Sequence, residues 1–179
     1  MSSPAELSAS ELPIDSTLTG PVLIIGSGLL GASIGLGLRA AGCEDVYVQD
    51  ISPTAEAVAQ DIGAGTSIST LSEEERASLA PQLVVVAAPP DSAGAVCARA
   101  LNTYAPRPEA GYPGAVVTDV ASVKVQPLAD VLASGADASR YVGSHPMAGR
   151  EKSGPVAARG ELFPVSYTHL RAHETLRYL

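Results

Sequence analysis

The chain has 179 residues, of which 46% are hydrophobic, and a formal net charge of -8. This length suits one domain with its own hydrophobic core and is too short for two domains of ordinary size. The excess of acidic residues argues against nucleic acid and against an anionic membrane as binding partners.

Residues 1–19 carry neither the basic start nor the apolar run of a signal peptide, and we expect them to form a flexible leader. The apolar stretches further along the chain are long enough for strands and much shorter than a membrane span. The two cysteines, Cys43 and Cys97, have neither metal-ligand nor redox spacing, which favours a reducing compartment. Together these features predict a cytoplasmic protein that does not enter a membrane.

Short apolar runs alternate along the chain with segments of helical periodicity. In the first helical segment, Leu30, Ile34 and Leu38 recur at the spacing of one buried face. Ser52 and Pro53 are typical of a helix cap and a first helical turn. Strands are expected at residues 21–25, 46–49, 66–68, 83–87, 115–118 and 141–144, and helices at 29–41, 53–62, 73–79, 92–101 and 123–133. Such alternation predicts a doubly wound α/β fold, with a parallel sheet covered on both faces.

The residues between the first strand and the first helix match the pattern G-x-G-x-x-G of dinucleotide-binding turns. The first glycine permits the tight turn, the second lets the backbone approach a pyrophosphate, and the third lets the helix pack closely. The phosphates would meet unpaired amides and the positive end of the helix dipole. The residues expected to contact a cofactor here are Gly26, Ser27, Gly28, Leu29, Leu30 and Gly31.

Asp50 ends the second strand, 19 residues after Gly31, near the spacing expected for a ligand of the ribose hydroxyls. A carboxylate there accepts hydrogen bonds from those hydroxyls and repels a 2′-phosphate, which favours NAD over NADP. Ala88 and Pro89, at the carboxyl end of a central strand, would face the same crevice, where they either touch the cofactor or only end the strand. The alternative is that the glycines only form a turn and that Asp50 caps the next helix.

Two polar segments, TDVASVK (118–124) and GSHPMAG (143–149), follow later strands of the same sheet. Parallel strands gather their carboxyl ends at one edge, so Ser122 and His145 are expected to converge there. Histidine is suited to accept a proton near neutral pH, and a hydroxyl can orient its ring. The alternatives are that Ser122 caps the following helix and that backbone bonds hold His145 in a turn. For Asp119 and Lys124, a solvated or helix-capping role is as compatible with the sequence as a functional one.

With GSGLLG before them, TDVASVK and GSHPMAGREKSG resemble the motif set of the prephenate and arogenate dehydrogenase family, over residues 20–163. The resemblance implies NAD-dependent oxidative decarboxylation of prephenate to 4-hydroxyphenylpyruvate in tyrosine biosynthesis, or the matching reaction of arogenate. His145 would accept the proton of the substrate hydroxyl, and Ser122 would orient His145 near the nicotinamide.

The resemblance also implies a helical C-terminal domain, which completes the substrate pocket with an arginine and forms most of a homodimer interface. No residue of this sequence can be assigned that arginine's role. We therefore expect the 179-residue chain to be a fragment that binds NAD and is inactive alone.

Residues 164–179 differ in character from the domain expected at 20–163. The string VSYTHLRAHET (165–175) resembles a translated sequencing adapter, which predicts an artefactual tail. The alternative, a metal site formed by His169 and His173, lacks a third ligand nearby. Two rival functions stay open: another dehydrogenase on the same cofactor fold, such as an imine or hydroxy-acid enzyme, and a nucleotide-sensing module without catalysis.

Overall fold

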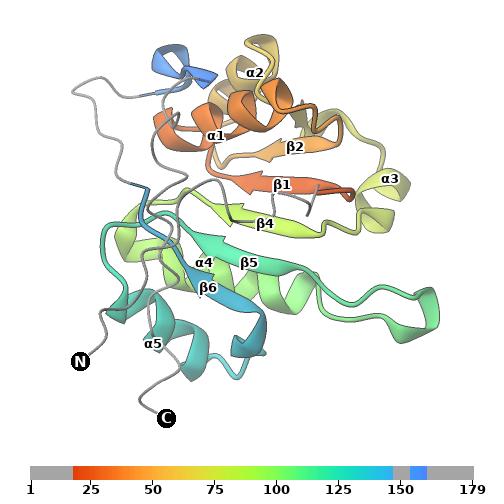
Figure 1. Cartoon of the computed structure of the whole chain (residues 1–179), viewed down its shortest axis with the longest axis vertical. Helices are drawn as coiled ribbons and strands as arrows, with labels where there is room; N and C mark the ends of the chain where they lie inside the picture. Colours follow the sequence, from red (N-terminus) through yellow and green to blue (C-terminus); the bar gives the residue numbers. More distant parts are fainter. Residues whose placement is uncertain (1–17, 147–153, 161–179) are drawn as a thin grey trace, which may run out of the picture.

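The structure, a computed structural model, describes residues 18–146 and 154–160. Its centre is a six-stranded sheet in the order β3-β2-β1-β4-β5-β6, in which all neighbouring strands are parallel (Figure 1). The strands are β1 (Val22–Ile25), β2 (Val46–Gln49), β3 (Thr66–Ser67), β4 (Leu83–Val86), β5 (Val116–Asp119) and β6 (Tyr141–Gly143). The predicted doubly wound α/β fold is confirmed.

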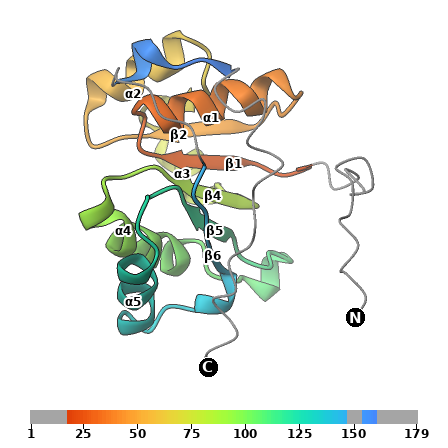
Figure 2. The same ribbon diagram turned by 60° about the vertical axis from the view of Figure 1, so that its left-hand side comes forward.

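Helices cover both faces of this sheet. The first two α-helices lie on one face and the fourth and fifth on the other (Figures 1 and 2). The helices are α1 (Leu29–Ala40), α2 (Pro53–Asp61), α3 (Glu73–Ser78), α4 (Pro90–Thr103) and α5 (Val125–Ala133), with 3-10 turns η1 (Ile68–Thr70), η2 (Pro108–Ala110), η3 (Ala138–Arg140) and η4 (Pro155–Ala157). None of the helices in the described part of the chain combines the length and the hydropathy needed to cross a membrane.

The expected elements agree with the structure to within two residues at each end, and the two-residue shifts occur at both ends of α4 and at the start of α5. α4 begins at Pro90 rather than at residue 92, because proline has no N–H to leave unpaired in the first turn. α5 begins at Val125 rather than at residue 123. The preceding turn is held open by Asp119, whose carboxylate accepts the N–H of Ala121 at 2.9 Å.

The core forms two layers, one on each side of the sheet. Val22 and Ile24 of β1 are fully buried among the residues of α1 and α2, whereas Leu23 is fully buried in the layer under α4 and α5. This alternation follows from the strand geometry, which points successive side chains to opposite faces. A strand buried on both faces must be apolar throughout, as the run VLII is.

The buried face of α1 differs from the one that the sequence predicts. Leu30, Ile34 and Leu38 are only partly buried and pack around the core, while the fully enclosed positions are small residues. A side chain at Gly31 would collide with the Gly26 carbonyl, and one at Gly35 with the Ala64 carbonyl. The prediction holds in part: the three large residues pack against the core, but their spacing does not reveal the small residues that a helix this close to the sheet needs at its fully buried positions.

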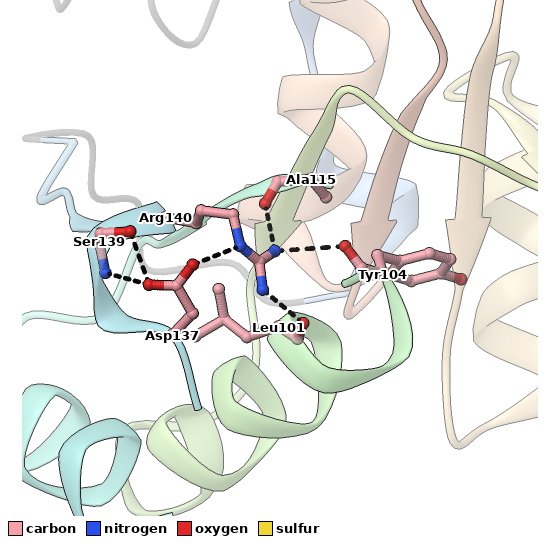
Figure 3. Close-up of polar contacts among 6 residues, drawn as sticks. All are labelled: Leu101, Tyr104, Ala115, Asp137, Ser139 and Arg140. Atoms are coloured by element: carbon pink, nitrogen blue, oxygen red, sulfur yellow. Dashed lines mark hydrogen bonds and ion pairs between the residues drawn. The ribbon is translucent and has the colours of Figure 1, made fainter. Parts of the chain in front are cut away.

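Arg140 joins three elements at the amino edge of the sheet (Figure 3). Its guanidinium donates to the carbonyls of Leu101 (2.8 Å) and Tyr104 (3.2 Å) at the end of α4, and to that of Ala115 (2.9 Å) just before β5. It also pairs with Asp137 at 3.1 Å, and its side chain is only 13% exposed. A largely buried cation thus adds donors to carbonyls at the end of α4 and just before β5, of which the Tyr104 carbonyl also accepts the Ala115 N–H at 3.0 Å.

We predict that Arg140→Ala lowers the free energy of unfolding by about 2–3 kcal/mol, because it leaves the Leu101 and Ala115 carbonyls without this donor and removes charge-assisted hydrogen bonds. Arg140→Lys should recover less than half of this loss, since an ammonium cannot reach three carbonyls in one plane. Urea denaturation measures both. Arg99→Ala is the matched control on the exposed side of α4 and should change stability by less than about 0.5 kcal/mol. Equal effects of Arg140→Ala and Arg99→Ala would contradict this prediction.

Candidate active site

The turn between β1 and α1 is built around Gly26. Its φ angle is +105°, a backbone conformation that residues with a side chain rarely adopt. Its N–H donates to the Gln49 carbonyl of β2 at 2.8 Å. A Cβ atom on it would lie 2.5 Å from the Ala87 carbonyl oxygen. Only glycine lets the chain turn this sharply between two neighbouring strands.

The amino end of α1 lacks the groups that usually satisfy a helix terminus. The N-cap residue is Gly28, no side chain caps the helix, and no acidic residue stands in its first turn. A Cβ atom on Gly28 would meet no heavy atom within 4 Å, so open space lies in front of this backbone. The buried Ser27 hydroxyl has no hydrogen-bond partner among the described residues. An uncapped helix end with room before it fits a phosphate group.

Asp50 stands directly beside this turn. One carboxylate oxygen accepts the Ser27 N–H at 2.5 Å, and the other accepts the Ser52 N–H at 2.8 Å. The cap of α2 is the Ser52 hydroxyl, which accepts the Ala55 N–H at 3.3 Å. The helix-capping alternative for Asp50 is therefore wrong, and the carboxylate lies half-buried at the border of the glycine turn.

Glu56 holds the backbone of Asp50, a role that the sequence analysis did not predict. It is 2% exposed and accepts the Asp50 N–H at 2.9 Å, the Ser69 N–H at 3.0 Å and the Ser67 hydroxyl. Burial acts to raise the pKa of Glu56, but the hydrogen bonds outweigh it and hold this pKa below its ordinary value. A glutamate in a first helical turn ordinarily indicates an exposed helix-dipole partner, so the sequence offered no sign of its burial.

Ala88 and Pro89 follow β4, whose neighbour on one side is β1. The Ala87 N–H just before them donates to the Ile25 carbonyl at 2.7 Å. Pro89 is exposed and serves as the N-cap residue of α4. These residues therefore lie beside the glycine turn at the carboxyl edge, and their contact with a cofactor stays a prediction.

Ser122 and His145 follow the adjacent strands β5 and β6. Both are exposed. Ser122 is not the cap of α5: the N-cap residue is Lys124, and no side chain caps this helix. No hydrogen bond links Ser122 to His145, or His145 to backbone, within the residues that the structure describes. The capping alternative for Ser122 is wrong, and both side chains are accessible at the carboxyl edge.

Because the sheet is entirely parallel, the glycine turn, Asp50, Ser122 and His145 all follow the carboxyl ends of strands on one edge. The glycine turn follows β1 and His145 follows β6, which lie three strand spacings apart. At the usual strand separation this is about 14 Å, a span on the scale of an extended dinucleotide. Residues 147–153 of the second motif lie outside the described residues, as does the histidine pair at 169 and 173. In the described part of the chain, no group of three or more His, Cys, Asp or Glu residues could hold a metal ion.

Comparison with known proteins adds a family to this geometry. Residues 34–170 match the family described as the nucleotide-binding domain of prephenate dehydrogenase. The chain belongs to this family. The match begins just after the glycine turn and extends into residues 164–179, the segment that we predicted from the sequence to be an artefactual tail.

Individual relatives agree with the family. The chain is 42% identical, over 79% of its length, to the probable prephenate dehydrogenase NovF of Streptomyces niveus, and 31% identical over 82% to the prephenate dehydrogenase of Lactococcus lactis. It covers 34% and 39% of those proteins. The crystal structure of Aquifex aeolicus prephenate dehydrogenase, in complex with hydroxyphenyl propionate and NAD+, superimposes with a TM-score of 0.66 at 29% identity. The match covers 83% of this chain and 49% of that one, so the chain spans less than half of these relatives.

We predict that Glu56→Gln destabilises the protein at pH 7 by about 1–3 kcal/mol, because an amide cannot accept from all three donors at once. Folding lowers the pKa of Glu56 below its ordinary value of 4.5. Its contribution is therefore complete above that pH and is lost as the pH falls through the lowered folded value. Denaturation measured at pH 7 and below pH 4 should show that acidification lowers the free energy of unfolding less in Glu56→Gln than in the wild type.

The control for this experiment is Glu74→Gln, which changes an exposed glutamate of α3. It should leave both the stability at pH 7 and its acid dependence close to those of the wild type. The assignment fails if Glu56→Gln loses as much stability on acidification as the wild type does.

Proposed function

We propose that this chain is the nucleotide-binding part of an NAD-dependent prephenate dehydrogenase, which converts prephenate to 4-hydroxyphenylpyruvate in tyrosine biosynthesis. The observation that carries the proposal is the common edge: an uncapped glycine turn beside a carboxylate, and an accessible serine and histidine, all follow parallel strands of one sheet. The family match supports the same assignment. An arogenate substrate is the second candidate within this family.

The cofactor site is formed by the chain's own backbone and one carboxylate. The amides at the start of α1 and its dipole would hold the pyrophosphate, with Gly28 leaving room for it. Asp50, fixed by the Ser27 and Ser52 amides, would accept the ribose hydroxyls and repel a 2′-phosphate. Bound NAD supplies the hydride acceptor. Ala88, Pro89 and Ser122 would line the way from this turn to the reacting end.

The proposed chemistry uses His145 as the proton acceptor. His145 accepts a hydrogen bond from the ring hydroxyl of prephenate. It takes the hydroxyl proton as hydride leaves the ring carbon that bears this hydroxyl. The ring carboxylate departs as carbon dioxide, its bonding electrons complete the aromatic ring, and the proton returns to the phenolate oxygen. Ser122, in the turn after the neighbouring strand β5, would orient the imidazole once cofactor and substrate are bound. The substrate carboxylates need a cation, which we assign to the part of the relatives' length that this chain does not cover.

We predict that the 179-residue chain binds NAD and that Asp50→Asn weakens this binding about 10- to 100-fold, because charge-assisted hydrogen bonds to the ribose are lost. The same change should narrow the preference for NAD over NADP. Isothermal titration calorimetry measures both affinities. Asp45→Asn, at an exposed aspartate just before β2, is the control and should bind NAD as the wild type does. Unchanged affinity in Asp50→Asn would exclude Asp50 as the ribose ligand.

We predict that His145→Asn lowers kcat for prephenate by about 10²–10⁴-fold in the full-length enzyme that this proposal implies, while NAD affinity stays within twofold. The 179-residue chain alone should bind NAD without measurable turnover. Parallel assays with arogenate identify the preferred substrate. A nucleotide-sensing module would show no turnover even as part of the full-length protein. Turnover that survives His145→Asn would remove His145 from the mechanism.

A further inference from the structure

Asp119, the last residue of β5, has a side chain that is fully buried and fully engaged. One carboxylate oxygen accepts the Ala121 N–H at 2.9 Å and the Lys124 ammonium at 2.5 Å. The other accepts the Tyr141 hydroxyl at 2.5 Å. With 0% exposure and three donors around it, this carboxylate has no route to a substrate or a cofactor. Of the roles that the sequence left open for Asp119, the solvated and the helix-capping role are therefore excluded, and a functional role is left.

The donors to Asp119 come from both sides of the proposed reaction site. Ala121 and Lys124 flank Ser122 in the turn after β5, so both ends of that turn are tied to one carboxylate. On the other side, Tyr141 begins β6, which lies beside β5 at the sheet edge (Figure 1). The backbone carbonyl of Asp119 also accepts the N–H of Ser144 at 3.0 Å and its hydroxyl at 2.7 Å. Ser144 is the residue directly before His145.

Gly143 provides the space in which this network is closed. A Cβ atom there would lie 3.1 Å from Cδ of Lys124, 3.3 Å from the Asp119 carboxylate and 3.4 Å from the Tyr141 hydroxyl. In the sheet register, Gly143 pairs with Asp119 itself. The glycine of the GSH string thus has a packing reason, which is to let β6 approach the carboxylate and both of its side-chain donors.

The charges of the network balance. A buried carboxylate is stable only when it is paired and hydrogen-bonded, and Lys124 supplies the opposite charge with its side chain 26% exposed. Burial, followed by the hydrogen bond to Asp119, raises the pKa of Tyr141 far above its ordinary value, so its hydroxyl remains a donor. Loss of any one member would leave Asp119 or its partner short of a hydrogen bond at a site where water has little access, which favours a rigid arrangement.

Resting on the proposed function, we propose that Asp119 is a positioning residue for the reaction: its carboxylate and carbonyl fix the turn that carries Ser122 relative to the strand end that carries His145. Asp119 acts through these two side chains and touches neither substrate nor cofactor. The same hydrogen-bonded network includes Tyr141 and Lys124 as donors, and Gly143 leaves the space for it. Its loss should impair the geometry of proton transfer while the nucleotide site, built on β1 and β2, stays intact.

The test compares two tyrosines, each of which donates one part-buried hydrogen bond. Tyr141→Phe removes the donor to Asp119, and Tyr112→Phe removes a 2.8 Å bond to the Pro81 carbonyl, away from the carboxyl edge. In the full-length enzyme that the proposed function implies, we expect Tyr141→Phe to lower kcat at least tenfold with KM for NAD within twofold. Tyr112→Phe should leave kcat unchanged although Tm falls by a similar amount. Unchanged kcat in Tyr141→Phe, or an equal loss in both variants, overturns the proposal.

A second measurement needs no turnover and separates this inference from the proposed function. In the 179-residue chain, NMR spectra report the ring of His145 and the amide of Ser122. We expect Tyr141→Phe and Asp119→Asn to shift both sets of resonances, and Tyr112→Phe to shift neither. If the wild-type full-length enzyme turns over neither prephenate nor arogenate, the proposed function is wrong, but the positioning role is not affected. Unshifted resonances in Tyr141→Phe and Asp119→Asn defeat the positioning role.

Discussion

The all-parallel sheet is the constraint on which the rest of this molecule depends. Parallel strands put every carboxyl end at one edge, so each loop that leaves a strand there faces the same side. The glycine turn after β1, Asp50 after β2, and the serine and histidine segments after β5 and β6 owe their common orientation to this topology. An antiparallel β6 would move His145 to the opposite edge of the sheet.

Two buried acids then convert this coarse arrangement into fixed geometry. Glu56 holds the backbone of Asp50 beneath the proposed ribose site, and Asp119 holds the two loops of the proposed reaction site. Each carboxylate accepts at least three hydrogen bonds from backbone and side chains on different elements. Loops are ordinarily the most mobile parts of a fold. Here buried acceptors tie the functional loops to the rigid sheet.

The sequence was sufficient for the fold because its patterns are local. Apolar strand runs and the Ser52 cap each carry their own physical rule, and the structure follows them to within two residues. The candidate site residues could likewise be placed on one edge, because that step needs only the strand order of a doubly wound sheet. Their contacts with ligands remain predictions.

What the sequence did not predict are interactions between distant elements. Glu56 reaches Ser67 and Ser69 on the next strand and turn, and Asp119 reaches Tyr141 and Ser144 across the edge of the sheet. Nothing local distinguishes these acids from solvated ones. The small residues that form the fully buried face of α1 were missed for the same reason, since the closeness of Gly35 to Ala64 is set by tertiary packing.

The most direct measurement of the central claim is a crystal structure of this chain with NAD bound. We expect the pyrophosphate on the amides at the start of α1, the ribose hydroxyls on Asp50, and the nicotinamide ring reaching Ser122 with its reacting face open toward His145. A nicotinamide ring that lies away from β5 and β6, with His145 beyond the reach of a substrate bound against it, would contradict the account.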